Sequence, residues 1–123
     1  MKLGYYIILA VAIGIVWALV YTYGSPLRMS AAEARRRIQK GEIDKVVDVR
    51  TDIEVQTLGA YPGSIHVQSA ELDKKAAVLF GKNDRLLLYC NSGQRARAAA
   101  EKLKNMGYSN VRYIAEPYIA LTQ

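Results

Sequence analysis

The apolar residues divide the chain into two unequal parts. Residues 4–23 carry no charge and are apolar on every side of a helix, not along one stripe. Every acidic residue, and every basic residue except Lys2, lies after residue 24. As a helix, an uncharged run of this length spans roughly the 30 Å hydrocarbon core of a bilayer. We therefore expect a transmembrane helix at residues 4–23, a short flank at residues 1–3 and a linker at residues 24–29.

Aromatic rings stand at both ends of this apolar run, as is typical of segments that meet the two membrane interfaces. They are Tyr5, Tyr6, Trp17, Tyr21 and Tyr23. A cleaved secretory signal usually has an apolar core of only about 7–15 residues, followed by small residues. The residues before Ser25 fit neither feature, so the sequence favours a retained single-pass anchor. A cleaved signal with a secreted or periplasmic product, and a buried helix of a soluble domain, are the alternatives.

The cations that flank the run predict its orientation. Lys2 stands alone on the short side, and a larger group follows on the other side: Arg28, Arg35, Arg36, Arg37 and Lys40. By the positive-inside rule, the domain at residues 30–123 then lies in the cytoplasm. A reducing compartment would also keep the lone thiol of the chain reduced.

From residue 30 onward, short helical and strand signals alternate. Ser30 and Glu33 form a capping-box signature, which predicts a helix from there to about Gln39. We expect strands at residues 45–49, 65–67, 85–89 and 111–114 and further helices at residues 69–80 and 94–106, with a polar stretch at residues 50–58. The apolar run at residues 85–89 suits the middle of a parallel sheet. This alternation predicts an α/β domain with a central, mostly parallel sheet flanked by helices.

The charge and the cysteine count limit the classes of partner and ligand that the chain is expected to bind. The net charge of +6 is compatible with anionic substrates or an anionic membrane surface. Basic and aromatic residues do not interleave as they do in many nucleic-acid binders, so no nucleic-acid partner is expected. One cysteine allows no intramolecular disulfide and no metal site built on a cysteine pair. We expect neither a metal nor a cofactor, and the sequence leaves the oligomeric state open.

Candidate chemistry lies in the segment Cys90-Asn91-Ser92-Gly93-Gln94-Arg95, which leads from a predicted strand into a predicted helix. Ligands bind beyond the carboxyl ends of such strands. Inward-facing backbone N–H groups and the helix N-terminus favour an anion there, and Gly93 permits tight curvature. Arg95 opposes the helix dipole, which suggests a compensating anion such as the Cys90 thiolate or a bound substrate. The alternative is an inert cysteine buried at a strand end.

This loop resembles the active-site loop of the rhodanese family. Three further matches follow the order of that family. Asp48-Val49-Arg50 resembles its Asp-Val-Arg signature, residues 59–65 (GAYPGSI) resemble its Gly-His-Ile-Pro-Gly-Ala-Ile turn, and Gly107-Tyr108 resembles its Gly-(Phe/Tyr) ending. The resemblance covers about residues 30–121, and it implies a rhodanese fold.

The resemblance also implies a reaction. Cys90 would take sulfane sulfur from a small anionic donor such as thiosulfate, carry it as a persulfide and pass it on. The backbone amides of residues 91–95 would cradle the persulfide or the leaving group. Because the chain has no second cysteine, the acceptor would be external: cyanide, a small thiol or another protein. Four residues separate Cys90 from Arg95, the sulfurtransferase length, whereas the related phosphatases have one more.

Other matching positions have supporting roles by resemblance. Asp48 and Arg50 would support the sheet edge and the loop, His66 would have a polar structural role, and Glu54 would be an ion-pair partner. Asn91 departs from the arginine of many thiosulfate-using members, which puts thiosulfate in doubt as the donor. Glu116-Pro117 replaces the usual Gly-Gly pair. These departures keep a second hypothesis open, a weakly active or inactive module that acts as a membrane-tethered binding scaffold.

Overall fold

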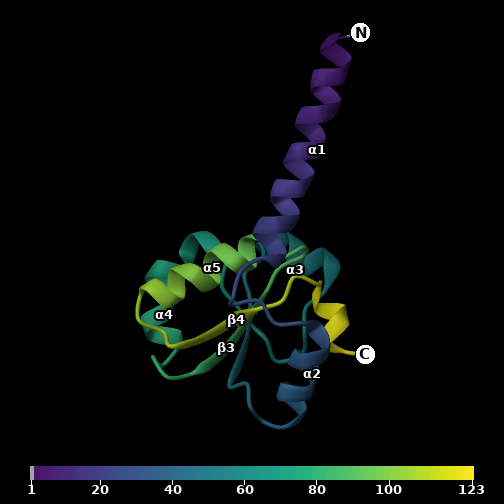
Figure 1. Ribbon diagram of the computed structural model, residues 1–123. Coiled ribbons are helices and arrows are strands. Elements are labelled where there is room, and N and C mark those ends of the chain that lie inside the picture. Colours follow the sequence, from purple (N-terminus) through teal and green to yellow (C-terminus); the bar gives the residue numbers. More distant parts are fainter. Residues whose placement is uncertain (1) are drawn as a thin grey trace.

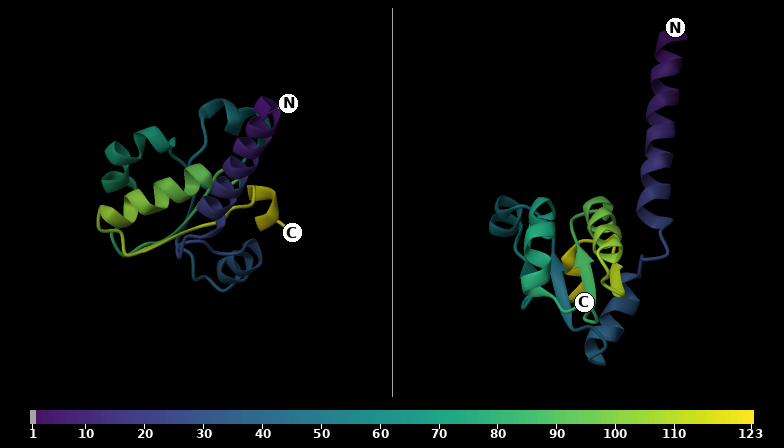
Figure 2. Two further views of the ribbon diagram at one scale, coloured as in Figure 1. Left: turned by 45° about the horizontal axis from the view of Figure 1, so that its top comes forward. Right: turned by 90° about the vertical axis from the view of Figure 1, so that its left-hand side faces the viewer.

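The computed structural model describes residues 2–123 and has two visibly different parts (Figure 1). The first is a helix, α1 (Lys2–Tyr23), of 22 residues. It projects away from an α/β domain, as Figure 1 and the right-hand view of Figure 2 show. Its most apolar 18-residue window has a mean hydropathy of 2.4, and none of that window is buried. By length and composition, α1 is able to cross a membrane, which a signal sequence would also be.

A four-stranded parallel sheet forms the centre of the domain. Its strands are β1 (Lys45–Asp48), β2 (Ile65–His66), β3 (Arg85–Tyr89) and β4 (Asn110–Tyr113), in the spatial order β2-β1-β3-β4. All neighbouring pairs are parallel. β3 lies between two other strands, and Leu86, Leu87 and Leu88 are at most 1% exposed. The predicted α/β class and the inner position of β3 are therefore confirmed.

Helices cover both faces of the sheet. They are α2 (Ala31–Gln39), α3 (Asp52–Leu58), α4 (Leu72–Leu79) and α5 (Gln94–Asn105), with short 3-10 helices η1 (Ser69–Glu71) and η2 (Tyr118–Leu121). On one face, Leu88 packs in a cluster with apolar residues of α4 and α5, such as Ala76 and Leu103. On the other face, Leu87 packs with Ala34 of α2 and Leu121 of η2. Alternate side chains of β3 thus join two separate cores.

Helix α3 lies where the sequence suggested only a polar stretch. Thr51 accepts a hydrogen bond from the Glu54 N–H at 3.4 Å, and its own N–H donates to Glu54 Oε1 at 3.0 Å. A complete capping box therefore starts this helix. None of its residues is fully buried, so it lacks the apolar stripe that reveals most helices. At Ser30 only half of the box forms, because the Glu33 carboxylate pairs with Arg37 at 2.9 Å.

The segment between α1 and α2 is held against the domain. Met29 N–H donates to Tyr113 O at 2.8 Å, and Tyr113 N–H donates to Leu27 O at 3.1 Å. Met29 is 1% exposed. These bonds extend the sheet beside β4. Tyr113 is the last residue of that strand, so α1 meets the domain at the carboxyl edge of the sheet.

We predict that Leu88→Ala lowers the free energy of unfolding by about 2–5 kcal/mol, because it leaves a cavity in the central strand. The matched control is Val78→Ala on α4, where the side chain is 86% exposed and the expected change stays within about 0.5 kcal/mol. Chemical denaturation of the full chain in mild detergent, followed by circular dichroism, measures both. Equal losses for the two variants would contradict the assigned core.

Candidate functional site at the Cys90 loop

The Cys90 loop, residues 90–95, runs from the end of β3 into the first turn of α5. Gly93 is the N-cap of α5, with φ at 101°, and it makes no side-chain cap. Its N–H donates to Cys90 Sγ at 3.0 Å. The sulfur therefore lies at the positive end of the α5 dipole and accepts a backbone N–H there. Cys90 is 1% exposed, so its sulfur is shielded from bulk water.

Close packing requires the glycine at position 93. A Cβ atom there would lie 2.8 Å from Ala115 Cα and 2.8 Å from Thr22 Cγ2. Its positive φ independently disfavours any side chain. The loop is thus enclosed by the segment after β4 and by the last turn of α1. Sequence reasoning identified the need for curvature at Gly93 but not these two neighbours.

Arg95 has a partner within the protein. Its guanidinium donates to Glu54 Oε1 at 2.6 Å and Oε2 at 2.8 Å. Asn91 Nδ2 donates to the same carboxylate at 2.6 Å. The predicted ion-pair role of Glu54 is therefore confirmed, and the hydrogen bonds from Arg95 hold the pKa of Glu54 well below its usual range. The compensating anion for Arg95 is a carboxylate from α3.

A buried ion pair supports the loop from below. Arg50 and Asp48 are 1% and 0% exposed, and Arg50 Nη2 lies 2.7 Å from Asp48 Oδ2. Tyr89 Oη also donates to Asp48 Oδ2 at 2.7 Å. Burial alone would raise the pKa of Asp48, but the hydrogen bonds from Arg50 and Tyr89 outweigh it and lower that pKa. Asp48 is consequently ionised at neutral pH.

Arg50 connects this pair to its surroundings. Its Nη2 donates to Gly59 O at 2.6 Å, in the turn before β2, and its Nη1 donates to Asn91 Oδ1 at 3.3 Å. Asn91 is therefore held between Arg50 and Glu54. The hydrogen bonds that Arg50 donates to Asp48 are the main reason that the pKa of Arg50 rises above its ordinary value. Both loop-side arginines are engaged with protein acceptors.

His66 lies on the same side of the sheet but bonds to the backbone. Its Nε2 is 2.6 Å from Arg50 O, and its Nδ1 is 3.5 Å from Asp52 Oδ1. This geometry ties the end of β2 to the start of α3. Within residues 2–123, no three histidine, cysteine or acidic side chains gather where they could hold a metal ion.

The tip of the Cys90 loop contacts α1. Ser92 Oγ lies 2.5 Å from Gln94 Oε1, and Gln94 Nε2 donates to Thr22 Oγ1 at 2.8 Å. Thr22 is 2% exposed although it belongs to α1, whose other residues are mostly exposed. Sequence reasoning missed this residue. Its one signal was a hydroxyl group among the apolar and aromatic residues that end α1.

The segment with Glu116-Pro117 still closes beside the site. Pro117, in extended conformation, caps the start of η2. The Tyr118 ring then lies 5.6 Å from the Arg50 guanidinium, centroid to Cζ, and Tyr118 Oη donates to Leu58 O at 3.3 Å. Pro117, the second residue at the positions where the resemblance implies a glycine pair, therefore stiffens this turn, and the packed Tyr118 follows it.

Most of the domain matches a known protein family. Residues 30–118 match the family described as Rhodanese-like domain. YrkF of Bacillus subtilis (strain 168), whose name marks it as a candidate sulfur carrier protein, is 31% identical over 77 residues, which cover 63% of this chain. The chain spans only 40% of the length of YrkF. The rhodanese domain-containing protein CG4456 of Drosophila melanogaster is 35% identical over 79 residues, with 54% of this chain and 70% of that protein covered.

Solved structures share the fold. The human single-domain sulfurtransferase TSTD1 superimposes with a TM-score of 0.67 at 22% identity, covering 80% of this chain and 96% of its own. A rhodanese-related protein from Thermoplasma volcanium gives 0.66 at 24% identity, covering 77% and 89%. At these identities the likeness shows the fold alone. It confirms the predicted rhodanese fold.

We predict that Gly93→Ala destabilises the protein more than Gly63→Ala. Both glycines have positive φ, 101° and 83°, so both substitutions incur backbone strain of about 1–2 kcal/mol. Only position 93 adds overlap with neighbouring atoms, whereas nothing lies within 4 Å of a Cβ at position 63. Thermal unfolding of the full chain in detergent compares the two variants. Equal shifts in Tm would show that α1 and Ala115 do not enclose the loop as described.

Glu54→Gln tests the Arg95 pair through pH. Because the pKa of Glu54 is lowered in the folded protein from its usual 4.5, its stabilising contribution is full above pH 4.5. That contribution is lost as pH falls through the folded pKa. We expect wild type to exceed the variant in unfolding free energy by a constant amount from pH 7 to about pH 5.5, and by less below pH 4.5.

Chemical denaturation at a series of pH values measures this difference, with Glu42→Gln, an exposed carboxyl, as the control. A difference between wild type and Glu54→Gln that stayed constant down to pH 3 would contradict the lowered pKa.

Proposed function

We propose, since the chain belongs to the rhodanese-like family, that it is a sulfurtransferase that carries sulfane sulfur as a persulfide on Cys90. The observation that carries this proposal is the hydrogen bond of 3.0 Å from the Gly93 N–H to Cys90 Sγ at the start of α5. A backbone donor and a helix dipole both favour negative charge on that sulfur. Sulfurtransferase and candidate sulfur-carrier relatives support the same class of reaction.

The first half-reaction loads the cysteine. With thiosulfate as donor, the Cys90 thiolate attacks the sulfane sulfur, the sulfur–sulfur bond of thiosulfate breaks, and sulfite leaves with the bonding electron pair. The outer sulfur of the new persulfide then carries the negative charge. In the loop, the backbone N–H groups of residues 91–95 would stabilise this charge as fixed dipoles that need no reorganisation.

The second half-reaction unloads it. An external thiolate, or cyanide, attacks the outer sulfur, and the electron pair of the broken bond returns to Cys90 Sγ. The acceptor leaves as a persulfide or as thiocyanate. Because the chain has a single cysteine, no thiol of the same chain can take the sulfur. A small thiol, cyanide or a protein thiol is the acceptor that this chemistry requires.

The donor site depends on dipoles more than on free cations. Arg95 is paired with Glu54, and Arg50 is paired with Asp48. Asn91, which replaces an arginine of many family members, bridges Arg50 and Glu54. An incoming anion would therefore meet few uncompensated positive charges. We propose that sulfane-sulfur donors with less charge than thiosulfate serve at least as well.

We also propose that α1 is retained as a single-pass membrane anchor, with the domain in the cytoplasm. The buried position of Thr22 supports retention, because cleavage before Ser25 would remove a residue that packs on Gly93. The excess of cations after α1 supports the orientation. Protease access to the domain in sealed vesicles tests it, and digestion from the outer side of right-side-out vesicles would overturn it.

We predict that the full chain in detergent gains one sulfur atom per molecule from a sulfane-sulfur donor. Intact-mass measurement should show the added sulfur after thiosulfate or an organic persulfide, and cyanide should remove it as thiocyanate. Cys90→Ser should gain none. If wild type gains no sulfur from either donor while its fold is intact, the chain is a binding module and not an enzyme. Sulfur transfer by Cys90→Ser would overturn the assigned nucleophile.

A further inference from the structure

The last turn of α1 is built into the candidate site and is not a flexible tether. Thr22 O accepts a hydrogen bond from Tyr113 Oη at 2.5 Å, and Thr22 Oγ1 accepts one from Gln94. Arg97 of α5 donates to Tyr21 O, and its guanidinium lies 4.0 Å above the centre of the Tyr21 ring. Backbone and side-chain contacts together fix the end of α1 on the first two turns of α5.

The helix runs without a break into this contact. Gly24 N–H donates to Val20 O at 2.8 Å, which continues the helical bonding beyond Tyr23. Arg28 lies 4.8 Å from the centre of the Tyr23 ring and holds the chain after the turn. Because the end of α1 is hydrogen-bonded and buried against the domain, the helix axis has a fixed orientation relative to the domain. The orientation of α1 therefore sets the orientation of the Cys90 loop.

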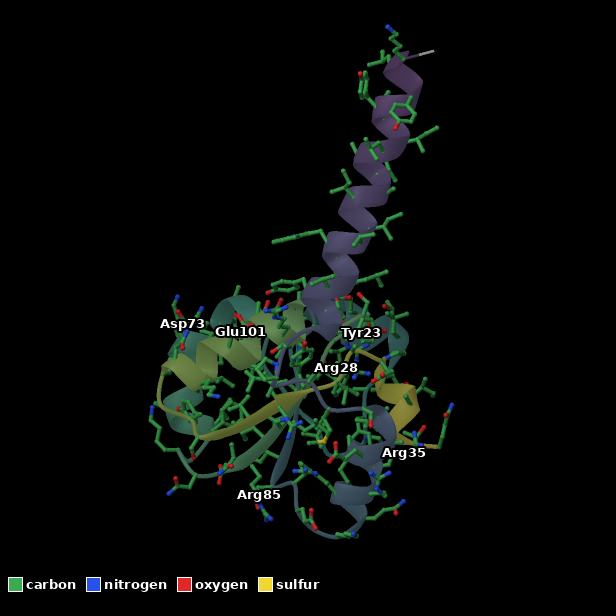
Figure 3. All side chains as sticks on the ribbon, viewed as in Figure 1. Tyr23, Arg28, Arg35, Asp73, Arg85 and Glu101 are labelled. Carbon is green, nitrogen blue, oxygen red and sulfur yellow. The ribbon has the colours of Figure 1, made fainter. Side chains whose placement is uncertain are left out.

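The direction of α1 places the loop toward the membrane. α1 leaves the domain from the carboxyl edge of the sheet, and the body of the domain lies on the other side of that edge (Figures 1 and 2). Figure 3 shows Tyr23 near the base of α1 and Arg85, the first residue of β3, at the far side. If α1 spans a bilayer, the edge that carries Cys90 faces the bilayer surface, and the amino edge faces water.

The carboxyl and amino edges of the sheet also differ in the polarity of their exposed side chains, and the more apolar edge is the one that α1 enters. The carboxyl edge carries α3, which exposes two aliphatic side chains, Ile53 at 72% and Leu58 at 56%. At the amino edge, Arg85 pairs with Asp44 at 2.9 Å and Lys45 pairs with Asp84 at 2.6 Å, with all four side chains partly exposed. Exposed aliphatic groups beside the point where a membrane helix enters suit contact with the lipid interface.

We propose that the carboxyl edge of the domain rests on the bilayer surface and that Cys90 exchanges sulfur with a thiol group held at that surface. This inference rests on the proposed sulfurtransferase activity and on retention of α1. The step is the unloading reaction described above, in which the attacking thiolate belongs to a membrane-held molecule. The contacts of α1 with Gly93 and Gln94 keep the Cys90 loop close to such a thiol, whereas a thiol in bulk solution is not held near it.

Location is tested first, without any need for activity. Two single-cysteine chains are made in the Cys90→Ser background: Ser92→Cys at the loop tip and Asn83→Cys at the amino edge, both at exposed positions. The five residues of β3 separate these edges by about 17 Å. Each full chain is labelled with a fluorophore and placed in lipid nanodiscs with or without headgroup spin-labelled lipid. We expect strong quenching at position 92 and weak quenching at position 83.

Exchange is tested next with the loaded wild-type chain in the same nanodiscs. The acceptors are a phospholipid that carries a headgroup thiol and soluble 2-mercaptoethanol. The control variant has twenty Gly/Ser residues inserted after Val20, a flexible spacer of about 25 Å that keeps membrane attachment, leaves Tyr21 and Thr22 docked on the domain and frees the domain from the bilayer. We expect the ratio of lipid-thiol to soluble-thiol rates to fall by roughly tenfold on insertion, while the soluble-thiol rate is kept or rises.

The outcomes separate the two proposals. Equal quenching at positions 92 and 83, or an unchanged rate ratio after insertion, overturns the membrane-facing site even if sulfur transfer is active. Absence of transfer to both acceptors overturns the sulfurtransferase proposal, and the quenching result then still decides the orientation of the domain.

Discussion

Gly93 stands where three parts of the chain meet, and the candidate site depends on the space that its missing side chain leaves. Its N–H bonds to Cys90 Sγ, while Thr22 of α1 and Ala115 of the segment after β4 approach the position of an absent Cβ. A positive φ at this residue turns the chain from the loop into α5. Without that turn the sulfur would not face the helix N-terminus. The same glycine therefore affects both the electrostatics of the sulfur and the docking of α1.

The charged residues around the loop satisfy one another. Glu54 holds Arg95, Asp48 holds Arg50, and Asn91 bridges the two pairs. Two cations are thus balanced by two carboxylates, and backbone dipoles such as the Gly93 N–H, which donates to Cys90 Sγ, add positive potential at the sulfur. Such dipoles are fixed by the fold and carry no counterion that must leave before an anion binds.

The sequence predicted those features that depend on local pattern. The apolar run of β3, the alanine-rich helix α5 and the loop between them each follow from spacing within a few residues. Helix α3 was not predicted because none of its side chains is fully buried, so only its capping box could have indicated a helix there. Contacts such as Gln94 to Thr22, 72 residues apart, leave no local signal at all. The sequence predicted an anion beside Arg95 but not that this anion is Glu54, which lies 41 residues away in the chain and reaches Arg95 only through the fold.

The contacts of α1 with the domain stabilise the structure around Cys90. A chain cut after Gly24 would lose the acceptor that Thr22 O offers to the Tyr113 hydroxyl. It would also uncover Gly93 and release the Gln94 amide at the first residue of α5. Both changes fall on the loop that holds the sulfur. The reactivity of Cys90 measured without α1 would therefore describe a looser and wetter site than the one that forms at the end of α1.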